Sequence, residues 1–137
     1  PSSPNAAYSR LKSELLEISI RQLRASAARA SLIQSVVDYV NLHYASNISI
    51  AGAAEQFDVS PNYLSSLFHK KTGKKFTEYL AELRMREAQK LLVETDLPIQ
   101  DITIKVGLYS MSHFGKLFAK YYHTSPQEYR KRMTGQI

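Results

Sequence analysis

Apolar side chains recur every three or four positions through most of this chain, with polar side chains between them. That spacing places the apolar residues on one stripe of an α-helix. No stretch shows the strict apolar and polar alternation of a convincing strand pair. The pattern therefore predicts an all-α fold with seven or eight helices.

The first predicted helix covers residues 8–29. Steps of four and three continue its first apolar stripe through Gln22 and Ala25, which makes only a weak coiled coil. The helix either packs on the following domain or contacts a second copy, and the pattern does not choose between them. The first stripe holds Leu11, Leu15 and Ile18, and the residues beside it are Leu16, Ile20 and Leu23.

A second helix is predicted over residues 31–44, where Ser31 is placed to cap its start. Its apolar face should form one wall of a core. The opening six residues, PSSPNA, are the one segment expected to be disordered. The predicted face holds Ile33, Val36, Val37, Val40 and Tyr44.

The next helices are bounded by turn signals. A short helix over residues 49–57 is followed by a tight turn at Asp58-Val59, and Ser60-Pro61 then begins a helix that runs to about Lys71. Gly73 is suited to end that helix in a left-handed conformation. A longer helix is predicted over residues 76–94. Its core positions are Phe76, Leu80, Leu83, Ala88, Leu91 and Leu92.

Three more helices complete the prediction. Pro98 marks the start of a short helix that ends near Val106, and a turn at Gly107-Leu108 follows. We expect the next helix over residues 110–122 and a terminal helix over residues 125–132.

An internal repeat of about 30 residues links two of these segments. Each copy reads as a short helix, a tight turn and a second helix with an apolar inner face. Two such helices cross and share one small core, while the second keeps an outer face free. Ile50, Ala53 and Phe57 correspond to Ile99, Ile102 and Val106 at an offset of 49, and Leu64, Leu67, Phe68, Lys70, Glu78 and Tyr79 correspond to Phe114, Leu117, Phe118, Lys120, Glu128 and Tyr129 at an offset of 50.

The repeat has the form of two helix-turn-helix units that bind DNA. In such units the second helix enters the major groove and its N-terminal side chains meet base edges. One copy alone would fit an ordinary solvated helix face, whereas two copies with the same turn and basic tails favour DNA binding. The outer positions are Asn62, Ser65, Ser66 and His69 in the first copy and Met111, Ser112, Gly115 and Lys116 in the second.

The charge of the chain agrees with a polyanionic partner. The formal net charge is +6, and from Ser60 onward there are 13 basic against 7 acidic residues, compared with 5 of each before it. A basic domain suits nucleic acid or an acidic membrane surface. Charge by itself does not separate these partners.

The later part of the chain resembles the AraC/XylS family of bacterial transcription regulators, over about residues 31–133. This resemblance implies two helix-turn-helix subdomains joined by a long helix, which insert into successive major-groove segments and activate or repress transcription. It further implies double-stranded DNA and RNA polymerase as partners. The cytoplasmic location that we expect rests instead on the sequence, which has no bilayer-spanning run and no signal-peptide pattern at its start. The matching residues are Tyr63-Leu64, Leu67-Phe68, Gly73, Arg84, Ala88, Leu91-Leu92, Ile99, Ile102, Gly107-Leu108, Ser112-His113-Phe114, Phe118, Ser125-Pro126 and Tyr129-Arg130.

Carried over by position, the resemblance implies base contacts from Asn62, Ser65, Ser66, Met111, Ser112, Gly115 and Lys116. The expected phosphate contacts are Ser60, His69, Lys70, Lys71, Arg84 and Lys120. Arg84 and Arg86 could equally pair with Glu82 and Glu87.

Several positions depart from the family pattern. Ser66 stands where a basic residue is frequent, so the first helix is expected to read bases weakly. Thr103, Leu108 and His113 replace other residues and are expected in the core. His123 replaces Gly, so that helix end is expected to close differently.

We therefore divide the chain into an N-terminal linker helix (1–30), a DNA-binding domain (31–133) and a tail (134–137). The domain holds a first helix-turn-helix at about 49–71, a linking helix at about 76–94 and a second helix-turn-helix at about 98–122. The linker helix is a candidate contact for a homodimer or a signal. The first residue is Pro rather than Met, as expected of an excised or processed fragment.

Other chemistry finds little support in the sequence. There is no cysteine, and the four histidines lack metal-ligand spacing. No Gly-rich phosphate loop or nucleophile motif is present, so we expect no enzyme, no cofactor and no metal. No apolar run is long enough to span a bilayer. The remaining alternative is a protein-interaction module whose basic faces bind an acidic partner or a second copy.

Overall fold

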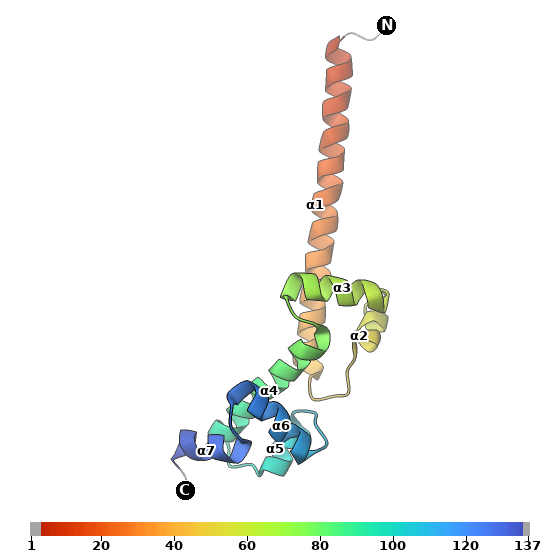
Figure 1. Ribbon diagram of the computed structural model, residues 1–137. Helices are drawn as coiled ribbons and strands as arrows, with labels where there is room; N and C mark the ends of the chain where they lie inside the picture. The colour runs from red at the N-terminus through yellow and green to blue at the C-terminus, as the bar shows by residue number, and fades with distance from the viewer. Residues whose placement is uncertain (1–3, 136–137) are drawn as a thin grey trace.

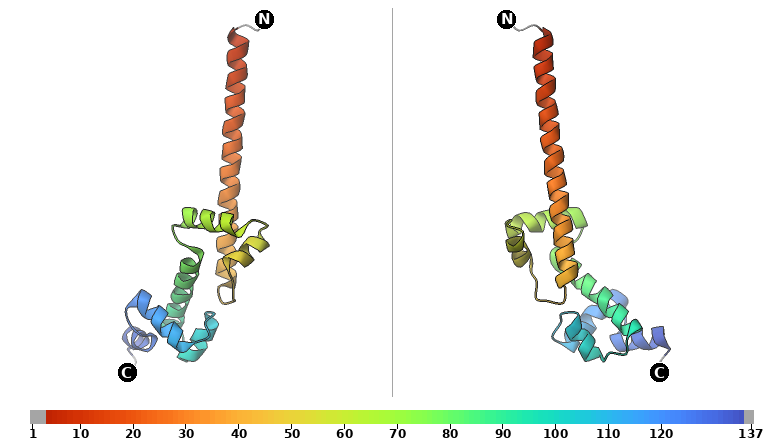
Figure 2. Two further views of the ribbon diagram at one scale, coloured as in Figure 1. Left: turned by 45° about the vertical axis from the view of Figure 1, so that its right-hand side comes forward. Right: turned by 180° about the vertical axis from the view of Figure 1, so that it is seen from behind.

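A single long helix stands out from a two-part helical body (Figure 1). The computed structural model describes residues 4–135, which form seven helices and no strand. Helix α1 (Pro4–His43) is 40 residues long. Its first half projects away from the other helices, and Figure 2 shows the same separation from two further sides. The all-α prediction is confirmed.

Helix α1 is continuous where two helices were predicted. It passes through residues 30 and 31 without a break, so the expected cap at Ser31 is wrong. The segment from Ala25 to Ser31 contains no Gly or Pro, and its alanines favour helix, so nothing local stops the helix there. The expected disorder is also wrong from Pro4 onward, because that Pro begins the helix, a position that suits its missing N–H. Residues 1–3 lie outside the described residues.

The first helix-turn-helix unit is α2 (Ile50–Gln56) with α3 (Pro61–Thr72), packed on the C-terminal part of α1. The following helix α4 (Phe76–Glu94) matches the predicted linking helix and contributes its first half to the same core. Buried in this first core are Ile33, Val36, Val40, Ala53, Ala54, Leu64, Leu67, Phe68, Phe76, Leu80 and Leu83.

The second unit is α5 (Ile99–Lys105) with α6 (Met111–Tyr122), and α7 (Pro126–Thr134) closes it against α4. Met85 is fully buried here although the sequence did not single it out, while Leu91 is only half-buried. Of the predicted tail, Thr134 ends α7 and Gly135 caps it, and residues 136–137 lie outside the described residues. The second core holds Met85, Ala88, Leu92, Ile102, Val106, Leu108, Phe114 and Phe118.

The end of α1 joins the two units. The Arg84 Nε atom donates to the Tyr44 carbonyl at 2.8 Å, and its Nη2 atom donates to the Ser46 carbonyl at 2.9 Å. Gly107, in the turn of the second unit, approaches the same segment so closely that a Cβ atom there would lie 3.0 Å from backbone atoms of Tyr44 and Ala45. The Arg84 side chain of α4 and the backbone of the second turn therefore hold the end of α1.

Serine caps begin both long helices of the repeat. The Ser60 Oγ atom accepts from the Tyr63 amide and the Ser110 Oγ atom accepts from the His113 amide, each at 3.2 Å. Each hydroxyl satisfies an amide that has no partner within its own helix. The two copies thus begin their outer helices with the same residue and the same hydrogen bond.

Candidate nucleic-acid interface

The outer face of α3 is polar and free. Asn62, Ser65, Ser66 and His69 are all exposed, and the helix buries Leu64, Leu67 and Phe68 on its opposite side. This division follows from the 3.6-residue period, which separates the two sets by about half a turn. The four polar residues predicted for the first copy therefore share one accessible face.

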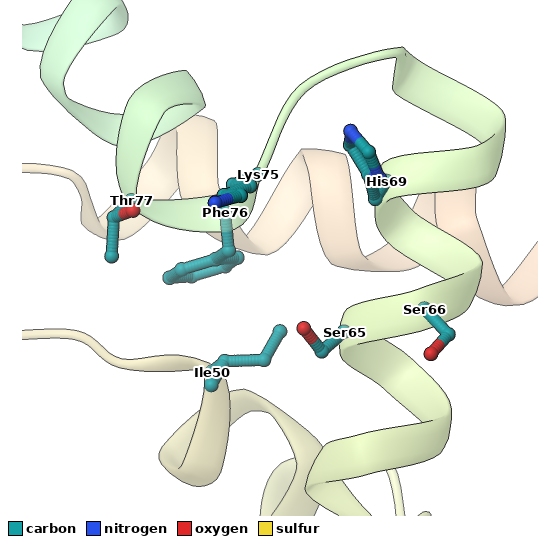
Figure 3. Close-up of a pocket in the computed structure, with 7 residues that line it drawn as sticks. All are labelled: Ile50, Ser65, Ser66, His69, Lys75, Phe76 and Thr77. Atoms are coloured by element: carbon teal, nitrogen blue, oxygen red, sulfur yellow. The ribbon is translucent and has the colours of Figure 1, made fainter.

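An open groove of about 310 Å³ lies beside that face, between α3 and the start of α4 (Figure 3). Three of the predicted residues line it, together with Lys75 and Thr77. Lys75 is the N-cap of α4 but makes no side-chain cap bond, which leaves the first amides of α4 without a helical partner. The groove therefore combines hydroxyl, amide and ammonium donors. Its lining residues are Ile50, Ser65, Ser66, His69, Lys75, Phe76 and Thr77.

Arg29 is a basic residue at this surface that the sequence did not reveal. It lies on α1 and lines a second open groove together with Tyr63, Ser66 and Lys70 of α3. Arg29 is separated from these residues by more than thirty positions, and no local motif connects them. The crossing of α1 and α3 thus brings a guanidinium beside Ser66, the position that lacks the basic residue frequent in the family.

Helix α6 presents the second predicted set. Met111, Ser112 and Lys116 are exposed and Gly115 is half-exposed, while Phe114 and Phe118 are buried on the other side. A Cβ atom at Gly115 would meet nothing within 4 Å, so packing does not require glycine there.

His113 is exposed, and its predicted place in the core is wrong. It directly precedes buried Phe114, and neighbouring positions on a helix point about 100° apart. Thr103 and Leu108 are buried as expected, and the Thr103 hydroxyl donates to the Ile99 carbonyl at 2.8 Å.

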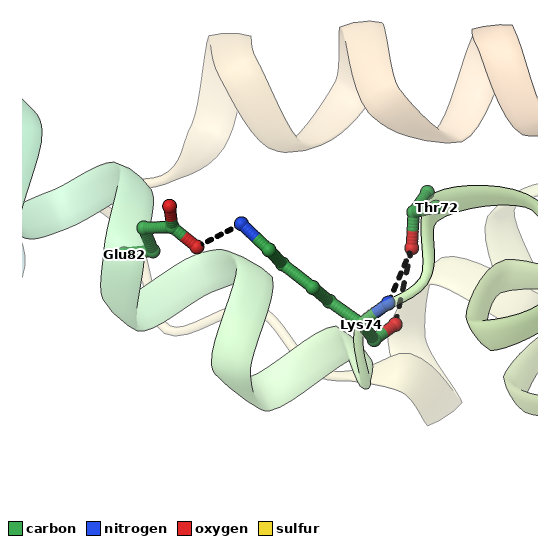
Figure 4. Close-up of polar contacts among 3 residues, drawn as sticks. All are labelled: Thr72, Lys74 and Glu82. Atoms are coloured by element: carbon green, nitrogen blue, oxygen red, sulfur yellow. Dashed lines mark hydrogen bonds and ion pairs between the residues drawn. The ribbon is translucent and has the colours of Figure 1, made fainter.

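Most of the expected phosphate contacts are accessible. Among residues 4–135, Lys70, Lys71 and Lys120 are exposed and form no ion pair, and Ser60 keeps its hydroxyl proton after accepting the cap bond. Lys74 lies nearby but pairs with Glu82 of α4, and its amide is held by the Thr72 hydroxyl (Figure 4).

Arg84 differs from these accessible residues, because its guanidinium faces the end of α1. Burial lowers its pKa, and Tyr109 opposes that effect. The alternative pairing of Arg84 and Arg86 with Glu82 and Glu87 does not form, since Glu82 pairs with Lys74 and Glu87 with Lys90. Two of its donors bind carbonyls within the fold, so we leave Arg84 out of the phosphate contacts proposed below.

Among residues 4–135, no three His, Cys, Asp or Glu side chains gather as a metal site would need. None of the helices there, α1 included, is both long and apolar enough to cross a membrane.

Two capped helices with free polar faces, each crossing a shorter helix and joined by α4, define a tandem helix-turn-helix DNA-binding domain. The sequence matches the family described as "Helix-turn-helix domain" over residues 53–132. The chain belongs to the AraC/XylS family of transcription regulators and carries the DNA-binding domain of that family.

Curated relatives agree with this assignment. The chain is 34% identical over 116 residues to the HTH-type transcriptional regulator YijO of Escherichia coli, covering 85% of this chain and 41% of that protein. It is 36% identical over 98 residues to the lactose operon transcription activator of Staphylococcus xylosus, covering 72% and 35%. The chain thus spans less than half the length of these relatives.

Solved structures share the architecture. The C-terminal domain of AraT, a response regulator from Geobacillus stearothermophilus, superposes with a TM-score of 0.72 at 31% identity, covering 74% of this chain and 84% of that one. The DNA-binding domain of AdpA, a global transcriptional factor solved in complex with a target DNA, gives a TM-score of 0.70 at 21% identity, covering 77% and 97%. The second likeness is one of fold.

Proposed function

We propose that this domain binds duplex DNA at a specific sequence, with α3 and α6 entering successive segments of the major groove. The observation that carries the proposal is the pair of Ser-capped helices whose outer faces are free and whose positions are fixed through α4. Helix α4 has 19 residues. At 1.5 Å per residue it spans roughly 28 Å, which together with the ends of its neighbours approaches the roughly 34 Å of one DNA turn.

Within this proposal the two helices read bases differently. Small hydroxyl and amide groups on α3 suit base edges, while Lys116 on α6 suits the acceptors of guanine. The proposed base contacts are Asn62, Ser65, Ser66, Met111, Ser112, Gly115 and Lys116, and the proposed phosphate contacts are Ser60, His69, Lys70, Lys71 and Lys120.

We add Arg29 to the phosphate contacts, because it lies beside Ser66 and Lys70 at the edge of the α3 face. In this position the Arg29 guanidinium supplies the positive charge that is missing at Ser66, where the family frequently has a basic residue. A phosphate contact carries no sequence information by itself. Arg29 is therefore expected to raise affinity for all duplexes alike.

We also propose the wider partners of such a regulator. RNA polymerase is a partner that would suit a relative of the Staphylococcus xylosus lactose operon transcription activator. A homodimer through α1 fits the leucines exposed along its projecting half. In this setting residues 1–30 act as a linker helix and residues 31–133 as the DNA-binding domain of a cytoplasmic protein that is not an enzyme.

Selection of duplexes from a random pool tests the central proposal. The expected result is a preferred sequence with two half-sites about one helical turn apart, and an affinity that falls steeply with salt. Lys116→Ala should relax specificity in one half-site and Asn62→Ala in the other. Each substitution should lower the discrimination against a wrong base by no more than about 1–3 kcal/mol. Arg29→Ala should weaken specific and scrambled duplexes equally.

A protein-interaction module would give a different outcome. The selected pool would show no preferred sequence at any salt concentration, and Lys116→Ala would behave like the other lysine variants. A footprint confined to one major-groove segment would leave the domain a DNA binder but contradict the use of both helices.

A further inference from the structure

The projecting half of α1 carries six large aliphatic residues that nothing in the described structure covers. Residues 4–28 are exposed throughout. The apolar residues form two stripes. We call Leu11, Leu15 and Ile18 the inner stripe and Leu16, Ile20 and Leu23 the outer stripe, and their exposed fractions range from 39% to 71%.

The buried end of α1 shows where each stripe points. Ile33, Val36 and Val40 face the first core. At 100° per residue the inner stripe lies within about 20° of that face, whereas the outer stripe lies about 130° away from it. Toward the C-terminal end of α1, the inner stripe therefore continues to Arg29 and Leu32, which are already partly covered by the body of the domain.

The outer stripe continues along a free face instead. After Leu23 its next positions are Ala27, Ala30 and Gln34, and all three are exposed although they lie beside the domain. A partner helix can therefore follow the outer stripe for its full length without meeting α3. A helix on the inner stripe would be stopped by the domain itself.

The spacing of the outer stripe is that of a coiled coil. Its positions follow steps of four and three residues, and its apolar centre is Leu16, Ile20 and Leu23. The d positions are Ser9, Leu16, Leu23 and Ala30, and the a positions are Ser13, Ile20, Ala27 and Gln34. Leu at d with a β-branched residue at a favours two parallel strands. The alanines at the lower end allow the two helices to approach closely where the domains begin.

The charges beside the outer stripe also fit a parallel pair. In that register Lys12 occupies a g position and Glu17 occupies the e position five residues later. Across a parallel dimer these positions face each other, so each interface edge gains one opposite-charge pair. Glu17 already lies 4.0 Å from Arg21 of its own helix, in an exposed and weak ion pair that leaves it free to turn.

We propose that a second copy of this chain pairs with α1 along the outer stripe as a parallel two-stranded coiled coil. The inference rests on the homodimer proposed above and states its surface, direction and register. Because the outer stripe lies away from the buried face of α1, this pairing places the two DNA-binding domains on the outside of the pair.

Adjacent leucines provide a matched test in the 137-residue chain. Leu15 and Leu16 are each 61% exposed and lie one residue apart on opposite stripes. By sedimentation equilibrium the unmodified chain should dimerise with increasing concentration. Leu16→Asp should weaken the dimer at least tenfold, while Leu15→Asp should leave it unchanged within twofold. Equal losses would overturn the choice of stripe, and a monomer at every concentration would overturn the dimer.

Disulfide trapping tests the direction of the pair. The chain has no cysteine, so Leu16→Cys and Leu23→Cys each introduce a single thiol. In a parallel pair both variants should crosslink to themselves on mild oxidation, because d positions face each other. Leu15→Cys serves as the control and should crosslink little. An antiparallel pair could bring only one of the two sites onto itself, so crosslinking at one site alone would contradict the proposal.

Charge reversal tests the register independently. Lys12→Glu and Glu17→Lys should each weaken the dimer, and the double variant should restore it to within a few-fold. Binding of Leu16→Asp to a single selected duplex separates this inference from the proposed function. If that variant binds DNA while the unmodified chain never dimerises, the dimer alone fails. If neither binds any duplex, the DNA proposal fails.

Discussion

Left-handed backbone positions end or turn the helices of both units, and they are occupied both by glycine and by residues with a side chain. Gly73 (φ 77°) and Gly107 (φ 92°) use the residue that adopts this conformation without a steric cost. Asp58 (φ 56°) and His123 (φ 62°) adopt it as residues with a side chain. The expectation that His123 closes α6 differently from glycine is wrong, because its amide still donates to the Ala119 carbonyl, as the Gly73 amide does to the His69 carbonyl.

Exchanging the two end residues should reveal the strain held at His123. His123→Gly relieves a left-handed side-chain residue and should raise the free energy of unfolding by roughly 0.5–1 kcal/mol after the greater freedom of glycine in the unfolded chain is counted. Gly73→His, at a site where a Cβ meets nothing within 4 Å, should lower it by about 1 kcal/mol. Urea unfolding measures both. A clear loss of stability in His123→Gly would show that the imidazole makes a contact worth more than the strain.

At the scale of elements, arginines from distant helices hold two helix ends. Arg84 donates to carbonyls at the end of α1, and Arg130 of α7 donates from Nε to the Leu92 carbonyl at 3.0 Å and from Nη2 to the Thr95 carbonyl at 3.2 Å. The last carbonyls of a helix have no partner within it, and cations there also oppose the negative end of the helix dipole. Tyr44 lies at the first of these junctions, where burial raises its pKa and the Glu87 charge adds to the effect.

The close approach of Gly107 to α1 predicts an asymmetry between two glycines. Gly107→Ala and Gly73→Ala both place a methyl group in a left-handed residue, but only Gly107 has backbone atoms 3.0 Å from that methyl. Gly73→Ala should cost about 1 kcal/mol, and Gly107→Ala should cost about 1–3 kcal/mol more, because the second unit must shift from the end of α1. Thermal or urea unfolding would measure the difference. Equal costs would mean that the junction yields easily and does not fix the two units.

On the scale of the whole molecule, the body consists of two separate cores that share one helix. The first core ends with Leu83 and the second begins with Met85. Tyr44 is the one side chain, among residues 4–135, that packs against both. Their relative placement therefore depends on α4 and on the Arg84 and Gly107 contacts rather than on a common interior.

Separate cores predict separate local unfolding. Phe118→Ala removes a fully buried ring from the second core and should cost about 3–5 kcal/mol. Native-state hydrogen exchange should then quicken in α5, α6 and α7, while α2 and α3 keep most of their protection. Phe68→Ala is the matched variant in the first core and should produce the reverse pattern. Uniform acceleration across both units would show that the domain opens as one cooperative body.

The sequence alone determined the helical class, the tandem repeat, the serine starts and the polar outer faces of α3 and α6. These depend on residues close together along the chain, where the 3.6-residue period and local capping decide the outcome. The linking helix over residues 76–94 is likewise bounded by local signals, Gly73 before it and Pro98 after it.

Tertiary structure decided what depends on distant residues. The continuity of α1 could not be foreseen because a serine in a helix-forming segment fits both a cap and a helix interior. Arg84 binds the end of α1, and Arg29 lies beside Ser66. The leucines in the first half of α1 are exposed. These outcomes depend on how the helices cross, because the crossing decides which side chains meet and which remain in solvent.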